Sequence, residues 1–193
     1  MQRYLVIFDL NGTLLQRLKK KDGALKNRSA VSLYSFSCNG SKVYIRPHLK
    51  RLIDDLFLLD NVDVAVWTSA QRSNADTLVK NIFGDHLSKL KFVWARDKCT
   101  DAPMGVKTDT VKKPLKKVWD ACDGIWNDRN TVLVDDSILK AVETPRNIYH
   151  IKKFDLLIDE DPLLDIELLN LRLWIKKIMA KSDDVRLLID QRI

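Results

Sequence analysis

Phe8-Asp-Leu-Asn-Gly-Thr-Leu14 is the stretch that decides the fold of this chain. The apolar residues 4–8 are mostly β-branched or aromatic and too few for an ordinary helix, so they predict a buried strand of a parallel sheet. The strand ends at Asp9, and the pair Asn11-Gly12 indicates a turn. Ligands of open α/β sheets bind beyond the carboxyl ends of the strands, which places Asp9 where a nucleophile or a metal ligand would act. On this segment alone, an aspartate that only caps a turn is an equally good interpretation.

The composition describes one globular domain with a basic surface. The 193 residues, 46% hydrophobic and 31% charged, are enough to bury a core. A net charge of +7 favours phosphoprotein, nucleic acid or acidic lipid as the partner, without choosing among them. Three cysteines without a paired short spacing indicate neither a disulfide framework nor a zinc site. The sequence shows no apolar run long enough for a membrane span and no signal-peptide cleavage site, so we expect a protein of the nucleus or cytoplasm.

Strands and helices are expected to alternate after the first strand. Apolar runs predict further strands at residues 62–66, 92–94, 131–134 and 148–151. Apolar residues at helical spacing predict helices at residues 47–57, 73–83 and 163–179, and a short helical segment after Lys113. The second helix is expected to begin at Ser73 or Asn74, and the last to carry the apolar residues Ile166, Leu169, Leu173 and Ile178. This alternation predicts a mainly parallel α/β sheet.

A basic segment without periodicity, residues 16–42, interrupts this pattern after the first strand. We expect it to form a flap or hairpin beside that strand. Its lysines and arginines fit a solvated basic tip better than a dedicated binding arm.

Polar side chains follow three of the predicted strands. The pairs are Asp9 and Asn11, Thr68 and Ser69, and Asp135 and Asp136. Because the carboxyl ends of parallel strands meet at one edge of a sheet, these groups can converge. With one lysine from the start of a helix they suit phosphoryl transfer, in which a carboxylate attacks phosphorus while hydroxyl, amide, lysine and Mg²⁺ hold the phosphoryl oxygens. Each pair alone is a weak signal, since a strand that ends in Asp-Asp is often only a solvated turn.

Four motifs occur in an order that is typical of one superfamily. They are Asp9-Leu-Asn-Gly-Thr13, Trp67-Thr-Ser-Ala70, Lys113-Pro-Leu-Lys-Lys-Val-Trp119 and Val134-Asp-Asp-Ser137. The set resembles the haloacid dehalogenase superfamily and, within it, the phosphatases of the RNA polymerase II C-terminal domain, of the small and ubiquitin-like-domain type with an NLI-interacting-factor-like domain. Val43-Tyr-Ile-Arg-Pro47 and Trp94-Ala-Arg-Asp97 add to this likeness.

The resemblance covers roughly residues 3–178 and implies an uncapped, Rossmann-like three-layer sandwich with a small flap inserted after the first strand. It implies a single phosphatase domain over residues 1–182, followed by a C-terminal tail at residues 183–193. Only 59 residues separate Asp9 from Thr68 and 45 separate Thr68 from Lys113, which leaves no room for a cap domain. An open crevice suits a phosphorylated side chain of a protein or peptide better than a buried metabolite.

The resemblance also implies a role for each motif residue. Asp9 would be the nucleophile that forms an aspartyl-phosphate, and Lys113 would pair with the phosphate and with Asp9. The implied Mg²⁺ ligands are Asp9, the main-chain carbonyl of Asn11, and Asp136 supported by Asp135. The resemblance places Thr13 and Thr68 at the phosphate, with Thr68 counted as catalytic. We add Ser69 and Arg96 to Thr13 as candidate substrate-binding residues.

Two of these assignments keep alternatives. We choose Lys113 over its neighbour Lys112 because it begins a Lys-Pro-Leu run with a tryptophan six positions on. Arg96, with Lys98 and Lys107 of the same loop, fits either the reading of a second negative charge or a solvated loop.

Asn11 departs from the family pattern, which has an aspartate at this position. That aspartate protonates the leaving oxygen and then activates water, and an amide can do neither. Since such acid–base help is worth about 10²–10⁴-fold, we expect slow turnover. Three explanations fit: an attenuated enzyme, a phosphate-recognising protein that has lost catalysis, or a substitution engineered to trap a complex.

Three functions therefore compete. The first is a Mg²⁺-dependent serine/threonine protein phosphatase, expected to be a monomer that acts on phosphorylated protein or peptide. The second is a pseudophosphatase that binds phosphoprotein or serves as a scaffold. The third, a nucleic-acid end phosphatase, is disfavoured because no aromatic residues alternate with the basic clusters in a stacking pattern.

Overall fold

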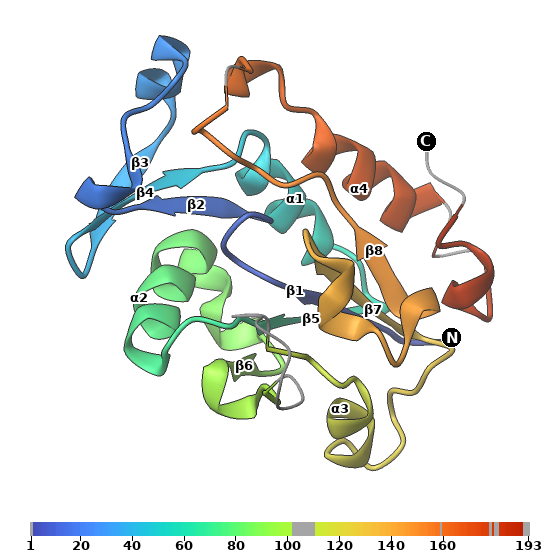
Figure 1. Cartoon of the computed structure of the whole chain (residues 1–193). Helices are drawn as coiled ribbons and strands as arrows, with labels where there is room; N and C mark the ends of the chain where they lie inside the picture. The colour runs from blue at the N-terminus through green and yellow to red at the C-terminus, as the bar shows by residue number, and fades with distance from the viewer. Residues whose placement is uncertain (1, 102–110, 159, 178, 180–181, 191–193) are drawn as a thin grey trace.

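A five-stranded parallel sheet forms the centre of the computed structural model, which describes residues 2–101, 111–158, 160–177, 179 and 182–190 (Figure 1). The strand order is β6-β5-β1-β7-β8. The bounds are Tyr4–Phe8 for β1, Val62–Trp67 for β5, Val93–Trp94 for β6, Thr131–Asp135 for β7 and Ile148–His150 for β8. All four strands expected after the first are present within one or two residues of their predicted bounds. The mainly parallel α/β fold is confirmed.

β1 lies in the middle of the sheet because its side chains are buried on both faces. Alternate residues enter two separate cores: Val6 packs in the larger core, whereas Ile7 packs in the smaller one. The register pairs Phe8 with Val66 of β5 and with Val134 of β7. The residues that follow these three strands therefore reach the same edge of the sheet.

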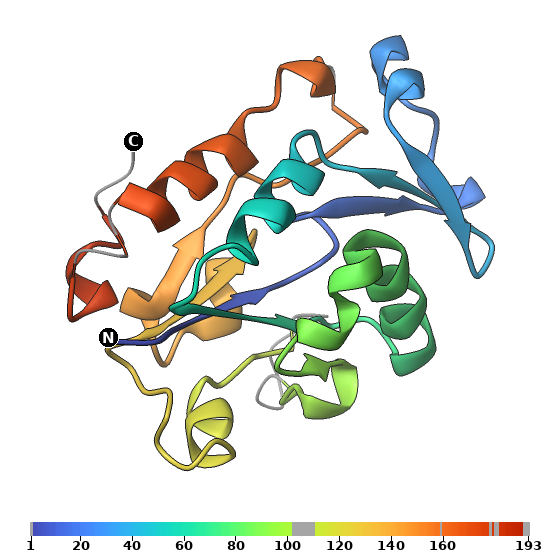
Figure 2. The same cartoon turned by 180° about the vertical axis from the view of Figure 1, so that it is seen from behind.

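Helices cover both faces of the sheet, as the three-layer prediction requires. α1 (Leu49–Leu56), α2 (Arg72–Phe83) and α4 (Glu167–Lys177) contribute to the larger core. α3 (Lys116–Asp120) packs in the smaller core, and Figures 1 and 2 show it across the sheet from α1 and α4. No helix among the described residues is long and apolar enough to cross a membrane.

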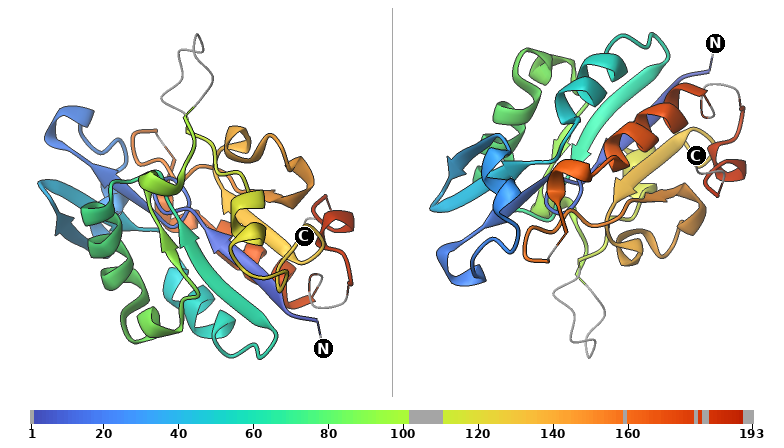
Figure 3. Two further views of the ribbon diagram at one scale, coloured as in Figure 1. Left: turned by 90° about the horizontal axis from the view of Figure 1, so that it is seen from below. Right: turned by 90° about the horizontal axis from the view of Figure 1, so that it is seen from above.

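The flap is a three-stranded antiparallel sheet in the order β2-β4-β3. Its strands are β2 (Leu15–Leu18), β3 (Ser35–Cys38) and β4 (Ser41–Ile45), so it reaches slightly beyond the predicted segment 16–42. A small third core holds it, in which Leu33 and Tyr44 pack near Phe154. Figure 3 shows the flap projecting from the sheet beside α2.

The N-terminus of α2 differs from the prediction. The helix begins at Arg72 with Gln71 as its N-cap residue, not at Ser73 or Asn74. The side-chain oxygen of Asn74 instead accepts hydrogen bonds from Asn39 (2.8 Å) and Arg17 (3.4 Å) of the flap. Asn74 therefore joins α2 to the flap, which sequence spacing could not reveal.

α4 is shorter than predicted and buries a different set of residues. It begins at Glu167, whose backbone N–H donates to Asp165 Oδ1 (3.0 Å). Its buried residues are Leu168, Leu171, Trp174 and Ile175, whereas Leu169 and Leu173 are only partly buried and Ile166 is exposed. The predicted stripe was wrong because nearly every position of this helix is apolar or amphipathic, so packing rather than pattern selects the face. Ile178 lies outside the described residues.

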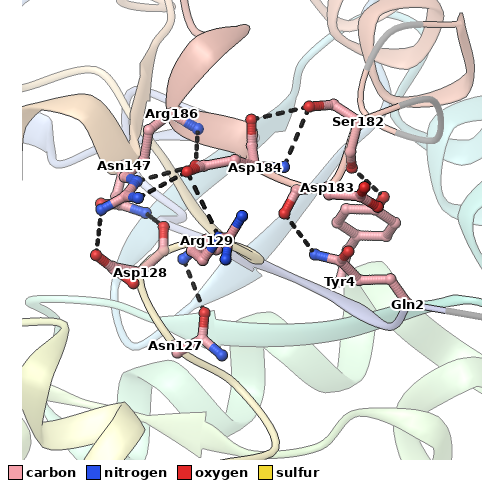
Figure 4. Close-up of polar contacts among 10 residues, drawn as sticks. All are labelled: Gln2, Tyr4, Asn127, Asp128, Arg129, Asn147, Ser182, Asp183, Asp184 and Arg186. Atoms are coloured by element: carbon pink, nitrogen blue, oxygen red, sulfur yellow. Dashed lines mark hydrogen bonds and ion pairs between the residues drawn. The ribbon is translucent and has the colours of Figure 1, made fainter.

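A polar network joins residues 182–190 to the start of β1 and to the turn before β7 (Figure 4). The Arg186 guanidinium donates to Asp184 and to Asp128, and the Tyr4 hydroxyl donates to the carbonyl of Ser182. Val185, in the segment predicted as a tail, is fully buried in the larger core. This network lies at the end of β1 opposite to Asp9.

Candidate active site

The site is built around Lys113, whose side chain is fully buried between two carboxylates. Its Nζ donates to Asp9 Oδ1 (2.5 Å) and to Asp135 Oδ2 (2.6 Å). Asp9 follows β1 directly and Asp135 is the last residue of β7, so the neighbouring strands bring the two acids together. Asp9 and Asp135 therefore meet at the carboxyl edge, as predicted.

The backbone on either side of Lys113 explains why this lysine, not Lys112, enters the site. The N–H of Lys113 donates to the carbonyl of Lys140 (2.7 Å), and Lys112 pairs with Thr100 in an isolated antiparallel bridge. Successive side chains of an extended segment point to opposite sides. Lys112 is consequently only half-buried, while Lys113 makes both ion pairs.

Burial and charge change the ionisation of the groups at the site. Burial raises the pKa of Asp9 to about 7; Lys113 opposes this rise and the charge of Asp135 adds to it. Burial likewise raises the pKa of Asp136, and Asp135 contributes. Burial alone would lower the pKa of Lys113, but Asp135 and Asp9 raise it overall, so the lysine stays a cation. Three acids around one lysine leave an excess of negative charge, which a bound cation would relieve.

The donor set fits Mg²⁺. One carboxylate oxygen from each of Asp9, Asp135 and Asp136 lies within 4.8 Å of the others. Asp135 already accepts from Lys113 through Oδ2 and from the Ser137 N–H (3.0 Å) through Oδ1, so it mainly supports the site. Asp136 has no ion-pair partner among the described residues, and Oδ1 is the only Asp9 oxygen paired with Lys113. Hard oxygens with room for water are what Mg²⁺ prefers.

Gly12 and Thr13 set the position of Asp136. Thr13 is fully buried, and its hydroxyl accepts a hydrogen bond from the Asp136 N–H (3.2 Å). Gly12 has φ +89°, and a Cβ there would lie 2.6 Å from Asp136 Oδ2. The carboxylate thus occupies the space that any other residue would fill, so the turn requires glycine for both conformation and contact. His150 Nε2 lies 3.0 Å from the Asp136 carbonyl oxygen.

The residues predicted to contact phosphate or substrate after β5 and β6 differ in burial. Thr68 is buried at the end of β5, and its hydroxyl accepts from the Ala70 N–H (3.2 Å). Ser69, next to it, is half-buried. The N–H of Arg96 donates to the carbonyl of Ala70 (2.9 Å), but the arginine side chain is exposed. Arg96 is therefore joined to the Thr68 loop through its backbone.

The prediction for Arg96 also covers Lys98 and Lys107. Lys98 Nζ lies 5.9 Å from the centre of the Trp94 ring, which directs it to that ring. Lys107 lies outside the described residues.

Asn11 is exposed, and its side chain faces the flap. Its Oδ1 accepts a hydrogen bond from the N–H of Arg17 in β2 (2.8 Å). The amide therefore joins the first motif to the flap, but it has no carboxyl group that could donate or accept a proton in catalysis.

Arg46 is the residue of this region whose role the sequence did not reveal. It follows β4, is 1% exposed, and donates to the carbonyl of Thr13 (3.0 Å). The run Val43-Tyr-Ile-Arg-Pro47 identified the position, but no sequence signal indicated that the guanidinium is buried.

The parallel sheet, the flap and the acid–lysine edge define a phosphatase domain of the haloacid dehalogenase superfamily. More narrowly, the chain belongs to the family of NLI interacting factor-like phosphatases, whose model matches residues 4–186. An uncharacterized FCP1 homology domain-containing protein of Schizosaccharomyces pombe is 33% identical over 162 residues, which are 79% of this chain and 62% of that protein. The chain thus spans less than two thirds of that relative's length.

Two solved structures share the fold. One is Fcp1, described as an essential RNA polymerase II CTD phosphatase, with a TM-score of 0.67. The other is an arginine-to-alanine variant of fission yeast Fcp1 bound to beryllium fluoride, with a TM-score of 0.68. Each match has 15% sequence identity and covers 98% of this chain and 70% of the other. At this identity the likeness concerns the fold.

Proposed function

We propose that this chain is a Mg²⁺-dependent serine/threonine protein phosphatase that acts through an aspartyl-phosphate on Asp9 and turns over slowly because of Asn11. The observation that carries the proposal is the buried Lys113 held between Asp9 and Asp135. A buried cation in such a pair costs desolvation, which a merely structural position could avoid with an apolar side chain. Its presence at the carboxyl edge, beside Asp136, supports phosphoryl transfer.

In the first step an Asp9 oxygen forms a bond to phosphorus while the bond from phosphorus to the serine or threonine oxygen breaks, and that oxygen takes a proton from solvent water. In the second step water attacks phosphorus and loses a proton to solvent while the bond from phosphorus to the Asp9 oxygen breaks, which releases inorganic phosphate and regenerates Asp9. Lys113 favours the ionised form of Asp9 and offers its charge to the phosphoryl oxygens, which the Thr68 hydroxyl would also contact. Asp9, Asp136 and the Asn11 carbonyl would hold Mg²⁺, which when bound would neutralise phosphoryl charge.

The substrate class follows from the surroundings of the site. The flap is the one insertion between the first and second motifs, and the interval from Thr68 to Lys113 is short in sequence, which favours an edge that is open to a protein segment. The basic flap favours an acidic or multiply phosphorylated partner. The family model is that of phosphatases, and Fcp1, which shares the fold, is described as an RNA polymerase II CTD phosphatase; together they favour a phosphorylated polypeptide as substrate.

A catalytically dead phosphoprotein-binding module is the second candidate, and Asn11 is the observation that favours it. Both steps above move a proton, and the amide of Asn11 can neither donate one to the leaving oxygen nor accept one from water. Among the residues that the structure describes, the Asn11 side chain makes one hydrogen bond, in which its Oδ1 accepts from the Arg17 N–H.

Phosphate release from an aryl phosphate, with and without Mg²⁺, separates the two candidates. We expect weak Mg²⁺-dependent release by the native chain, an increase of about 10²-fold in Asn11→Asp, and none in Asp9→Asn. Asn39→Asp, at a second Asn-Gly turn, adds the same charge within the flap and removes the hydrogen bond from Asn39 to Asn74, so it controls for both changes and should leave the rate unchanged. An Asn11→Asp protein that stays inactive and binds no metal would establish the binding module instead. Faster release from DNA or RNA ends than from phosphopeptides would identify a nucleic-acid phosphatase.

A further inference from the structure

Arg46 uses its buried guanidinium to join segments that are far apart in the sequence. Its side chain is 0% exposed. Nε and Nη2 face the Asp165 carboxylate (3.1 and 2.9 Å), Nη1 donates to the carbonyl of Thr13 (3.0 Å), and Nη2 donates to that of Lys152 (2.9 Å). The guanidinium carbon lies 5.5 Å from the centre of the Phe154 ring.

The backbone makes the same connections. The N–H of Arg46 donates to the carbonyl of Leu14 (3.1 Å), and the N–H of Phe154 donates to that of Gly12 (2.8 Å). Consecutive carbonyls of the first-motif loop are thus each held by a different donor: Gly12 by Phe154, Thr13 by the Arg46 side chain, and Leu14 by the Arg46 backbone. This loop cannot shift without breaking several of these bonds.

The loop held by Arg46 is the one that places Asp136. The Thr13 hydroxyl accepts from the Asp136 N–H (3.2 Å), and the α-carbon of Gly12 leaves the space that the Asp136 carboxylate fills. Thr13 therefore links the Arg46 guanidinium, through its carbonyl, to the proposed Mg²⁺ ligand Asp136, through its hydroxyl.

We propose that Arg46 is a positioning residue for the phosphoryl site: it fixes the Gly12–Thr13 turn against Asp136 and so sets the geometry of the proposed Mg²⁺ position. The effect on Mg²⁺ rests on the proposed function. The fixing of the Gly12–Thr13 turn rests on the hydrogen bonds alone. Arginine suits the position because its planar fork presents donors in several directions at once, whereas the single ammonium of lysine cannot reach Asp165 and both carbonyls together.

The test compares Arg46→Lys and Arg46→Met with Arg186→Met. Arg186 also pairs with aspartates, but at the far end of β1 (Figure 4), so its loss should destabilise the chain without touching the site. Calorimetric Mg²⁺ titration and urea unfolding are measured for each protein. We expect both Arg46 variants to lose about tenfold or more in Mg²⁺ affinity, as changes behind metal ligands usually do, and Arg186→Met to keep the native affinity.

Amide hydrogen exchange can be measured without a metal and in variants that are less stable than the native chain. Exchange at residues 12–14 and at Asp136 should accelerate in Arg46→Lys by more than at β1, and Arg186→Met should show no such local change. Uniform acceleration across the chain, with Mg²⁺ affinity that follows stability alone, would assign Arg46 a purely structural role. If the native chain binds no Mg²⁺, the proposed metal dependence fails, and the exchange pattern by itself decides whether Arg46 positions the loop.

Discussion

Replacing Lys113 by methionine should destabilise the chain strongly and in a pH-dependent way. Methionine keeps much of the length of lysine but removes the cation between Asp9 and Asp135, which are 4% and 0% exposed. Two buried carboxylates would then face each other beside Asp136 without a counter-charge. The loss should therefore exceed that of any ordinary ion pair on the surface.

The geometry gives the size of the effect. At an effective dielectric constant of about 20, unit charges 2.5 and 2.6 Å apart attract by about 6–7 kcal/mol per pair. Desolvation of the three groups offsets much of this, and removal of one partner from a buried pair typically costs about 3–5 kcal/mol. That is a large share of the total of about 5–15 kcal/mol by which domains are stable.

The pH dependence follows from the sign of the shift at Asp9. Its folded pKa of about 7 lies above the unfolded value near 4, so the folded chain keeps a proton that the unfolded chain has lost, and the free energy of unfolding falls between these pH values. Lys113 lowers the pKa of Asp9, so without it the fall continues to higher pH. The deficit of Lys113→Met should thus be smaller at pH 5 than at pH 8.

Urea unfolding, followed by tryptophan fluorescence in EDTA at both pH values, measures this deficit. Lys116→Met is the matched control, because Lys116 lies as close to Asp120 (2.6 Å) but in an exposed i,i+4 pair, and its loss should change little. Asp9→Asn in the Lys113→Met background should restore part of the stability. A deficit below about 1 kcal/mol that is equal at pH 5 and pH 8 would refute the account of a buried, charge-compensated site.

Two further predictions concern the metal. Gly12→Ala should cost about 1 kcal/mol or more in stability and weaken Mg²⁺ binding, because alanine is strained at φ +89° and its methyl group would displace Asp136; unchanged Mg²⁺ affinity by calorimetry would contradict the close contact. Since a proton on Asp9 competes with the cation, Mg²⁺ affinity should fall below about pH 7, by up to about tenfold per pH unit. Titrations at pH 5.5, 6.5 and 7.5 that give one affinity would show that Asp9 is not a ligand.

Much of the fold was predictable because its signals are local. A buried parallel strand reads as a short apolar run, so all five strands of the sheet were found from residues 4–8 and four similar runs. Turns and motifs are local signals too: Asn11-Gly12 marks the turn after β1, and the two acids after Val134 mark the end of β7. These residues act through their own backbone and their immediate neighbours.

Other features were decided by packing between distant segments. The face of α4 depends on which side meets the sheet, and the helix sequence is apolar on too many positions to specify it. Asn74 looks like a helix cap, but its side-chain Oδ1 accepts a hydrogen bond from Asn39 of the flap.

The sequence by itself determined which residue types stand at the strand ends, because strand, turn and motif patterns are properties of neighbouring positions. The sequence also favoured Lys113 over Lys112, but only the tertiary structure decided that Lys113 is buried between two carboxylates and that Arg46 is buried against Thr13 and Asp165. Lysine and arginine side chains are long and normally solvated, so their burial depends on partners from other segments of the chain, such as Asp9 for Lys113 and Asp165 for Arg46.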